Sequence, residues 1–187
     1  GSDPFIVLES ADLEEAANIG TTSRLLNSGQ SCIAAKRFIL IDTIADQFEN
    51  LLVEKFKALK VGDPMLEDTD LGPVATPSIL SELDHQVQES IKMGAKAIIG
   101  GKPLDIPGNF YPPTILKDIP PGSPADTEEF FGPVALVFRV KNLDEAIKLA
   151  NSTPLGLGAS GWTKNQAESD RMINEIEAGA VFVNGLV

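Results

Sequence analysis

The chain has 187 residues, 43% of them hydrophobic, which fits one globular domain. Its net charge of −12 argues against nucleic acid and anionic membrane surfaces as partners, because both are bound by clustered Lys and Arg side chains. The single cysteine cannot form an internal disulfide, no apolar run approaches the roughly 18 residues of a membrane span, and the polar start is no signal peptide. We therefore expect a cytoplasmic protein.

Short apolar or extended runs predict strands, at residues 5–8, 37–41, 97–99, 111–116, 134–140, 157–162 and 180–183. Amphipathic stretches predict helices between these runs, at residues 12–26, 44–59, 76–94, 142–150 and 166–176. Asp12 with Glu15 has the spacing of a capping box, and Thr76-Pro77 is a typical helix start. Strands that alternate with helices indicate an α/β domain over residues 1–187, with a largely parallel sheet and helices on both faces.

Cys32, the only cysteine, lies in a Gly/Ser/Gln-containing loop between a predicted helix and a predicted strand. Loops of this kind often present functional groups, because their backbone polar atoms keep them at the surface. Free cysteine is nevertheless among the most buried residue types and commonly packs as a small hydrophobe. Position alone therefore favours a structural role for this thiol.

Four short segments change that interpretation, and they read Gly1-Ser2-Asp3-Pro4-Phe5-Ile6-Val7-Leu8, Asn27-Ser28-Gly29-Gln30-Ser31-Cys32, Thr127-Glu128-Glu129-Phe130-Phe131-Gly132-Pro133-Val134 and Ala150-Asn151-Ser152-Thr153-Pro154-Leu155-Gly156-Leu157. In this order and at these separations they resemble the NAD(P)-dependent aldehyde dehydrogenase superfamily, most closely its succinate-semialdehyde dehydrogenase branch. The resemblance runs the length of the chain, and the motifs are specific as a set.

The resemblance implies a role for five residues. Cys32 matches the catalytic nucleophile, whose thiolate attacks an aldehyde to give a thiohemiacetal that loses hydride to the nicotinamide and leaves a thioester. The Cys32 backbone N–H matches an oxyanion donor. Ser31 and Ile33 would line the substrate pocket. Glu129 matches the glutamate that accepts hydrogen bonds from the nicotinamide ribose, and Phe131 matches a residue that packs against the nicotinamide.

The resemblance also implies a small aldehyde substrate, NAD or NADP as cofactor, and a homo-oligomeric full-length protein. The family's general-base glutamate, cofactor-binding domain and C-terminal oligomerisation segment have no counterpart in residues 1–187. We therefore expect a thiol-bearing catalytic domain that needs the cofactor-binding domain of the same parent chain. Alone it would bind no cofactor, oxidise nothing, and expose an apolar face larger than a monomer's usual patch.

Two positions depart from the succinate-semialdehyde pattern. Leu26 stands where many of these enzymes have an arginine for the substrate carboxylate, which weakens the case for an anionic substrate. Ala34 stands where many have a second cysteine, which excludes a disulfide switch in this loop.

Two further features compete for a function. Residues 156–161 fit the glycine pattern of a dinucleotide-binding loop, but they follow a helix and lead into an extended segment, so we reject that interpretation. His85 is the only histidine, and a Cys32–His85 pair would suit a thiol hydrolase, although a solvated helical histidine is the simpler interpretation. One Cys and one His fall short of a zinc site, so we expect no metal. A non-catalytic α/β binding or assembly module is a further alternative.

Overall fold

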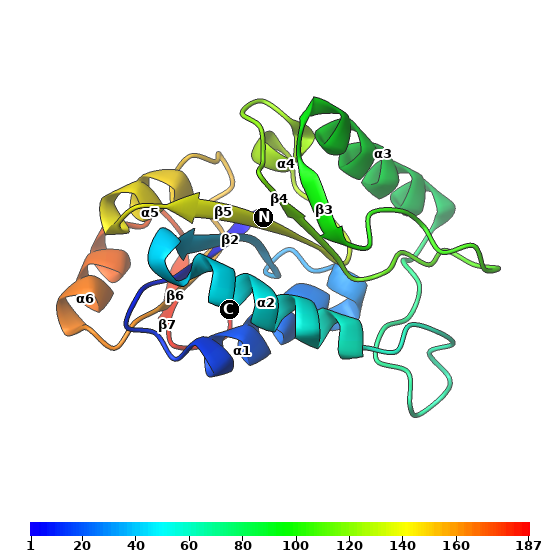
Figure 1. The fold of residues 1–187 in the computed structure, drawn as a ribbon, viewed down its shortest axis with the longest axis horizontal. Helices are drawn as coiled ribbons and strands as arrows, with labels where there is room; N and C mark the ends of the chain where they lie inside the picture. Colours follow the sequence, from blue (N-terminus) through cyan, green and yellow to red (C-terminus); the bar gives the residue numbers. More distant parts are fainter.

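The computed structural model describes residues 1–187 as one seven-stranded sheet with helices on both faces (Figure 1). The strands are β1 (Asp3–Val7), β2 (Ala35–Ile41), β3 (Lys96–Ile99), β4 (Thr114–Lys117), β5 (Val134–Val140), β6 (Gly158–Trp162) and β7 (Ala180–Val183). The helices are α1 (Leu13–Leu25), a short turn η1 (Leu26–Gly29), α2 (Asp42–Ala58), α3 (Pro77–Met93), α4 (Pro124–Thr127), α5 (Leu143–Ala150) and α6 (Gln166–Glu175). The strand order is β3-β4-β5-β2-β1-β6-β7, and only β3 runs antiparallel to its neighbour. The predicted fold class is confirmed.

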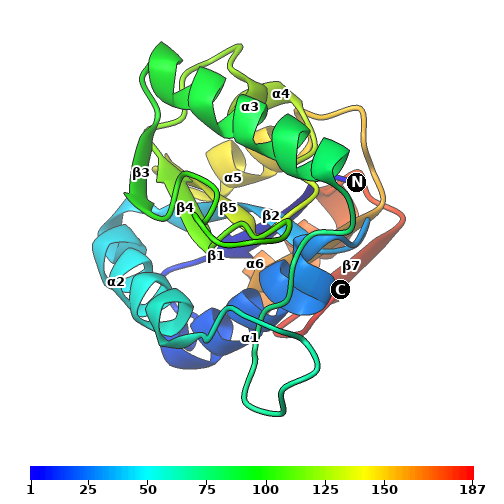
Figure 2. The ribbon, with the colours of Figure 1, turned by 90° about the vertical axis from the view of Figure 1, so that its right-hand side faces the viewer.

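Two helical layers cover the sheet (Figure 2). Helices α1 and α2 pack on one face, where the rings of Phe5, Phe38, Phe48 and Trp162 meet with centroids 5.1 to 6.4 Å apart. Helices α3 to α6 cover the other face. Strands β1 and β2 are buried at every position because both of their faces are covered.

The predicted helix starts are confirmed by their caps. The Asp12 side chain accepts a hydrogen bond from the Glu15 N–H, and the Thr76 hydroxyl accepts one from the Ile79 N–H. Two elements differ from expectation. Residues 124–127 form the single turn of α4, where no helix was expected, and the strand expected at residues 111–116 begins three residues later, at Thr114.

Three loops meet at one edge of the sheet because the strands that they enter are neighbours. Strands β5, β2 and β1 lie side by side and parallel, so the residues before Val134, before Ala35 and before Asp3 converge at the amino ends of the strands. Ligands of open parallel sheets usually lie at the carboxyl ends. The topology therefore brings the Cys32 loop and the Glu129 segment together at the less usual edge.

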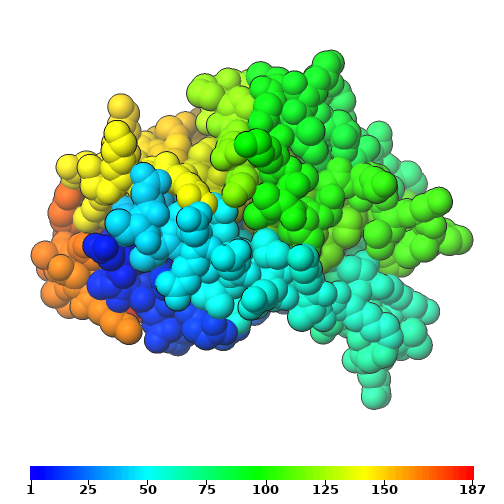
Figure 3. Space-filling view, in the orientation of Figure 1, coloured from blue at the N-terminus to red at the C-terminus, as the bar shows by residue number.

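On the surface, the acidic segment around residues 62–72 projects from the body of the molecule (Figure 3). No helix is both long enough and apolar enough to cross a lipid bilayer.

Candidate active site at the amino ends of three strands

Cys32 is exposed in the turn that joins η1 to β2. Ser31 beside it is half-buried, and Ile33 on the other side has 41% of its surface exposed. The thiol is therefore not packed in the core, which removes the structural role that position alone favoured. Its accessibility is a requirement for a nucleophile.

The chain reaches this turn through three consecutive residues with positive φ. Asn27, Ser28 and Gly29 have φ values of 54°, 56° and 75°, a left-handed conformation that ends α1 and reverses the chain toward β2. For non-glycine residues this conformation costs of order 1 kcal/mol each, so neighbouring contacts must hold it. Asn27 Nδ2 donates to the Gln30 carbonyl at 2.9 Å, and Gln30 Nε2 donates to the Asn27 carbonyl at 3.0 Å.

The segment that follows α2 holds the same turn from outside. The Ser28 hydroxyl donates to the Gly72 carbonyl at 3.0 Å, and Gln30 Oε1 accepts from the Ala75 N–H at 2.7 Å. A hollow of about 570 Å³ lies on this side, and Leu26, which is 61% exposed, forms part of its wall.

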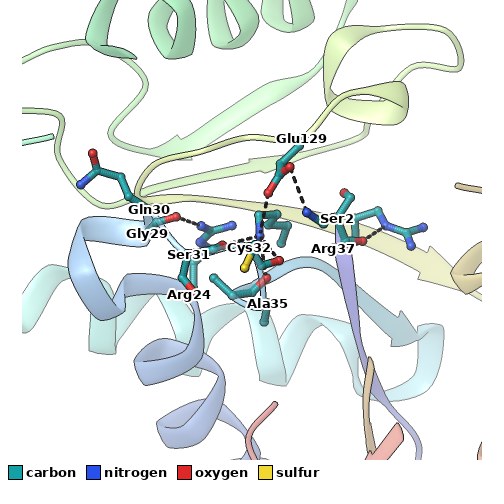
Figure 4. Close-up of polar contacts among 12 residues, drawn as sticks. Ser2, Arg24, Gly29, Gln30, Ser31, Cys32, Ala35, Arg37 and Glu129 are labelled. Atoms are coloured by element: carbon teal, nitrogen blue, oxygen red, sulfur yellow. Dashed lines mark hydrogen bonds and ion pairs between the residues drawn. The ribbon is translucent and has the colours of Figure 1, made fainter. Parts of the chain in front are cut away.

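Arg24, at the end of α1, is completely buried beneath the turn and donates from Nη2 to the Gly29 carbonyl (Figure 4). Its Nε and Nη1 have no hydrogen-bond partner. Burial lowers the pKa of the guanidinium to about 9, while the negative charges of Glu129 and Asp3 act in the opposite direction. Arg24 is thus a buried cation that fixes one carbonyl of the turn.

Lys36, the second residue of β2, has a side chain with no exposed surface. Its Nζ donates to three loop carbonyls, those of Ser31 at 2.8 Å, Cys32 at 3.2 Å and Ala34 at 3.1 Å. An ammonium has three N–H donors, so these bonds use all of them. Burial lowers the pKa of Lys36 to about 8, and the charge of Arg24 adds to this effect, whereas Glu129 opposes it.

Glu129 lies in the segment that enters β5 and points toward the Cys32 turn (Figure 4). Its Oε1 is 3.3 Å from Lys36 Nζ, and its Oε2 is 3.0 Å from the Gly1 nitrogen. Gln86 of α3 holds the backbone here, because its Nε2 donates to the Glu129 carbonyl at 3.2 Å. Phe130 is fully buried, so the adjacent Glu129 and Phe131 are turned toward the surface.

Glu129 and Phe131 border a hollow of about 250 Å³ against α3. Phe131 is 39% exposed, and Glu129 Oε1 is buried without a hydrogen-bond donor. The exposed part of the Glu129 side chain at this hollow can accept a hydrogen bond from a ribose hydroxyl, and the exposed ring beside it suits a flat heteroaromatic group. These residues therefore fit the nicotinamide-ribose end of a dinucleotide.

The two competing features are not assembled into a site. His85 is exposed on α3 and makes no hydrogen bond to Cys32. The glycine-rich residues 156–161 lie in β6 and the loop before it, and α6 begins only at Gln166, so no strand–glycine–helix unit exists there. No group of three or more His, Cys, Asp or Glu side chains is arranged to hold a metal ion.

The structure adds charged residues that sequence reasoning missed, namely Asp3, Arg24, Lys36 and Arg37, all buried beside or beneath the loops of the site. One signal was present in the sequence. Lys36 and Arg37 are adjacent cations inside an otherwise apolar strand, and charged residues are almost never fully buried unless they are paired.

Residues 1–187 match the model of the aldehyde dehydrogenase family over their full length, and the chain belongs to this family. A probable NADP(+) succinate-semialdehyde dehydrogenase of Synechocystis is 56% identical over 186 residues, and an NADP(+) succinate-semialdehyde dehydrogenase of Mycobacterium avium is 54% identical. These matches cover 100% of this chain but only 41% and 39% of the relatives. The chain thus spans about two fifths of the length of the curated relatives that it matches.

Solved structures of aldehyde dehydrogenases have the same fold as this chain. The succinic semialdehyde dehydrogenase of Streptococcus pyogenes, in complex with NADP+, superposes with a TM-score of 0.96 at 36% identity. Lactaldehyde dehydrogenase of Escherichia coli superposes with a TM-score of 0.97 at 35% identity. Both matches cover 100% of this chain, and 41% and 39% of those chains respectively.

Proposed function

We propose that this chain is the thiol-bearing catalytic domain of an NAD(P)-dependent aldehyde dehydrogenase, with Cys32 as nucleophile and Glu129 and Phe131 as contacts for the cofactor. The observation that carries the proposal is the shared contact with Lys36, whose Nζ lies 3.2 Å from the Cys32 carbonyl oxygen and 3.3 Å from Glu129 Oε1. The nucleophile loop and the cofactor carboxylate are therefore neighbours, as the reaction requires.

In the proposed reaction, the Cys32 thiolate adds to the aldehyde carbon and forms a thiohemiacetal. The Cys32 N–H faces the developing oxyanion, and Ser31 and Ile33 border the substrate. A bound nicotinamide cofactor supplies the hydride acceptor that this oxidation needs. Water then hydrolyses the resulting thioester to the carboxylic acid, with a base that comes from outside residues 1–187.

The relatives named for succinate semialdehyde and NADP(+) support that substrate and that cofactor for the full-length protein. Leu26 supplies no cation for a substrate carboxylate. The nearby Arg24 is buried and donates a hydrogen bond to the Gly29 carbonyl. We therefore propose that any cation that recognises the succinate semialdehyde carboxylate comes from another part of the full-length protein.

A cytoplasmic location and a homo-oligomeric state complete the proposal. An exposed, single thiol stays reduced in the cytoplasm, where disulfides are rare. Strand β7 forms an open edge of the sheet, and its Phe182 is 42% exposed, which favours cover by another chain or domain.

The test is a panel of aldehydes assayed with NAD and with NADP on the full-length protein. Succinate semialdehyde and the uncharged butanal, which has the same chain length, separate recognition of the carboxylate from aldehyde oxidation itself. Oxidation of neither aldehyde, nor of any other in the panel, would favour a non-catalytic binding module. His85→Ala should leave the rate unchanged, whereas a thiol hydrolase that uses Cys32 and His85 would lose its activity.

A further inference from the structure

Lys36 is a buried ammonium to which the proposed reaction assigns no chemical step. Burying a lysine is costly unless its donors and its charge are both satisfied. Here the donors are satisfied by the carbonyls of Ser31, Cys32 and Ala34, and the charge is satisfied by a different group, Glu129. The Cys32 loop therefore accepts the hydrogen bonds of Lys36, whereas the Glu129 carboxylate balances its charge.

This division holds one oxygen of Glu129 against Lys36, while part of the side chain, which is 28% exposed, stays at the hollow that it shares with Phe131. All three N–H groups of Lys36 are directed at carbonyls, so Glu129 Oε1 receives a neutralising charge at 3.3 Å without a hydrogen bond. The electrostatic attraction draws Oε1 toward the Cys32 turn and so fixes the orientation of the carboxylate. A second carboxylate, Asp3, also lies in the field of Lys36, but it makes no ion pair with it.

We propose that Lys36 is a positioning residue that fixes the Cys32 loop and the Glu129 carboxylate relative to each other, so that the bound cofactor lies beside the nucleophile. The inference rests on the proposed function, because it assigns Glu129 to the cofactor. It predicts that Lys36 acts on cofactor affinity through Glu129 and on the Cys32 loop through the three carbonyls.

A double-mutant cycle in the full-length protein tests the first link, with the Kd for NADP+ measured by binding rather than by turnover. We expect Lys36→Gln and Glu129→Gln each to weaken NADP+ binding about tenfold, the usual size of a lost interaction with a charged group. The double variant should bind no more than about twofold more weakly than Glu129→Gln alone, since both changes remove one coupled unit. Lys36→Arg, which keeps the charge, should restore most of the affinity.

Lys117→Met is the matched control, because Lys117 of β4 also pairs with a buried carboxylate, that of Glu49 at 3.0 Å, but has no contact with the loop. It should leave the Kd for NADP+ unchanged. A role for Lys36 in folding alone predicts that the effects of Lys36→Gln and Glu129→Gln on Kd add fully, and full additivity overturns the proposal.

Hydrogen exchange without cofactor tests the second link and remains informative if Lys36→Gln does not fold. In Glu129→Gln, Lys36 loses its counter-charge, so the amides of residues 31–34 should exchange several-fold faster. Unchanged exchange there overturns the proposal even if the enzyme is active. Failure of the unchanged protein to oxidise any aldehyde would instead refute the proposed function, which this exchange measurement does not assume.

Discussion

The backbone of Gly29 lies so close to that of Gly132 that a Cβ added to Gly29 would come within 2.2 Å of the Gly132 carbonyl oxygen. Gly29 belongs to the turn before Cys32, and Gly132 follows Glu129 and Phe131 in the segment that enters β5. Direct backbone contact therefore joins the two proposed halves of the site. A side chain at position 29 would separate them.

Gly29→Ala should lower both the stability of the fold and the affinity for NADP+. Alanine would have to adopt φ near +75° and push the Gly132 backbone away, which we expect to cost about 3 kcal/mol or more of the free energy of unfolding. The measurement is urea unfolding of the full-length protein together with its Kd for NADP+.

Gly122→Ala is the control, because Gly122 has nearly the same φ of +76° but no atom within 4 Å of an added Cβ. It isolates the conformational cost, which should be about 1 kcal/mol. Equal losses in the two variants would show that the Gly29–Gly132 contact has no influence on stability.

Arg37→Met should destabilise the fold without direct interference at Cys32. Arg37 is 3% exposed, and it donates to the Ser2 carbonyl at 2.8 Å and to the last carbonyls of α5, those of Leu149 at 2.7 Å and Ala150 at 2.8 Å. Methionine keeps much of the volume but removes all three hydrogen bonds, a loss of about 3 kcal/mol, although the Leu149 carbonyl still accepts from Ser152. Arg171→Met, which removes an exposed arginine paired with Glu175, should leave the unfolding midpoint unchanged.

Cofactor affinity should fall as the pH rises through about 8. Burial lowers the pKa of Lys36 from 10.5 to about 8, so Lys36 loses its charge near pH 8 in the folded protein. The charged groups that face it are Arg24 of α1, Asp3 of β1 and Glu129 before β5. Once Lys36 is neutral, it no longer attracts Glu129. Titrating the Kd for NADP+ from pH 7 to 9.5 checks this, and the Lys36→Arg variant should show a flat profile.

Stability should change in the opposite direction over the same range. Between about pH 8 and 10.5 the unfolded chain binds a proton at Lys36 that the folded chain does not, so the contribution of this residue to stability rises with pH. A Lys36→Met variant should lack this rise. If the affinity for NADP+ and the stability of the unchanged protein both rose, or both fell, between pH 8 and 9.5, Lys36 would not be the group that causes the two changes.

Most of the fold could be predicted from the sequence, because the helices and strands that the local sequence patterns favour are the ones that the packed structure contains. The caps at Asp12 and Thr76 and the apolar periodicity place the helices within one or two residues. The direction of β3 and the single turn of α4 could not be predicted, because strand direction depends on pairing partners and one turn carries no periodic pattern.

The site was less accessible to sequence reasoning. Position alone favoured a buried Cys32, and its proximity to Glu129 followed only from the family resemblance, since the neighbouring positions of β2 and β5 are a property of the topology. Arg24 and Lys36 were missed because charged residues are expected at the surface. Their burial depends on loop carbonyls that come together only in the folded chain.

Cys32→Ser in the full-length protein tests the central claim most directly. Serine is nearly isosteric and position 32 is exposed, so folding and NADP+ binding should be retained, while the rate of reduced-nicotinamide formation from an aldehyde should fall by about 10³-fold or more. A Cys32→Ser protein that oxidises the aldehyde at an undiminished rate would show that this sulfur is not the nucleophile.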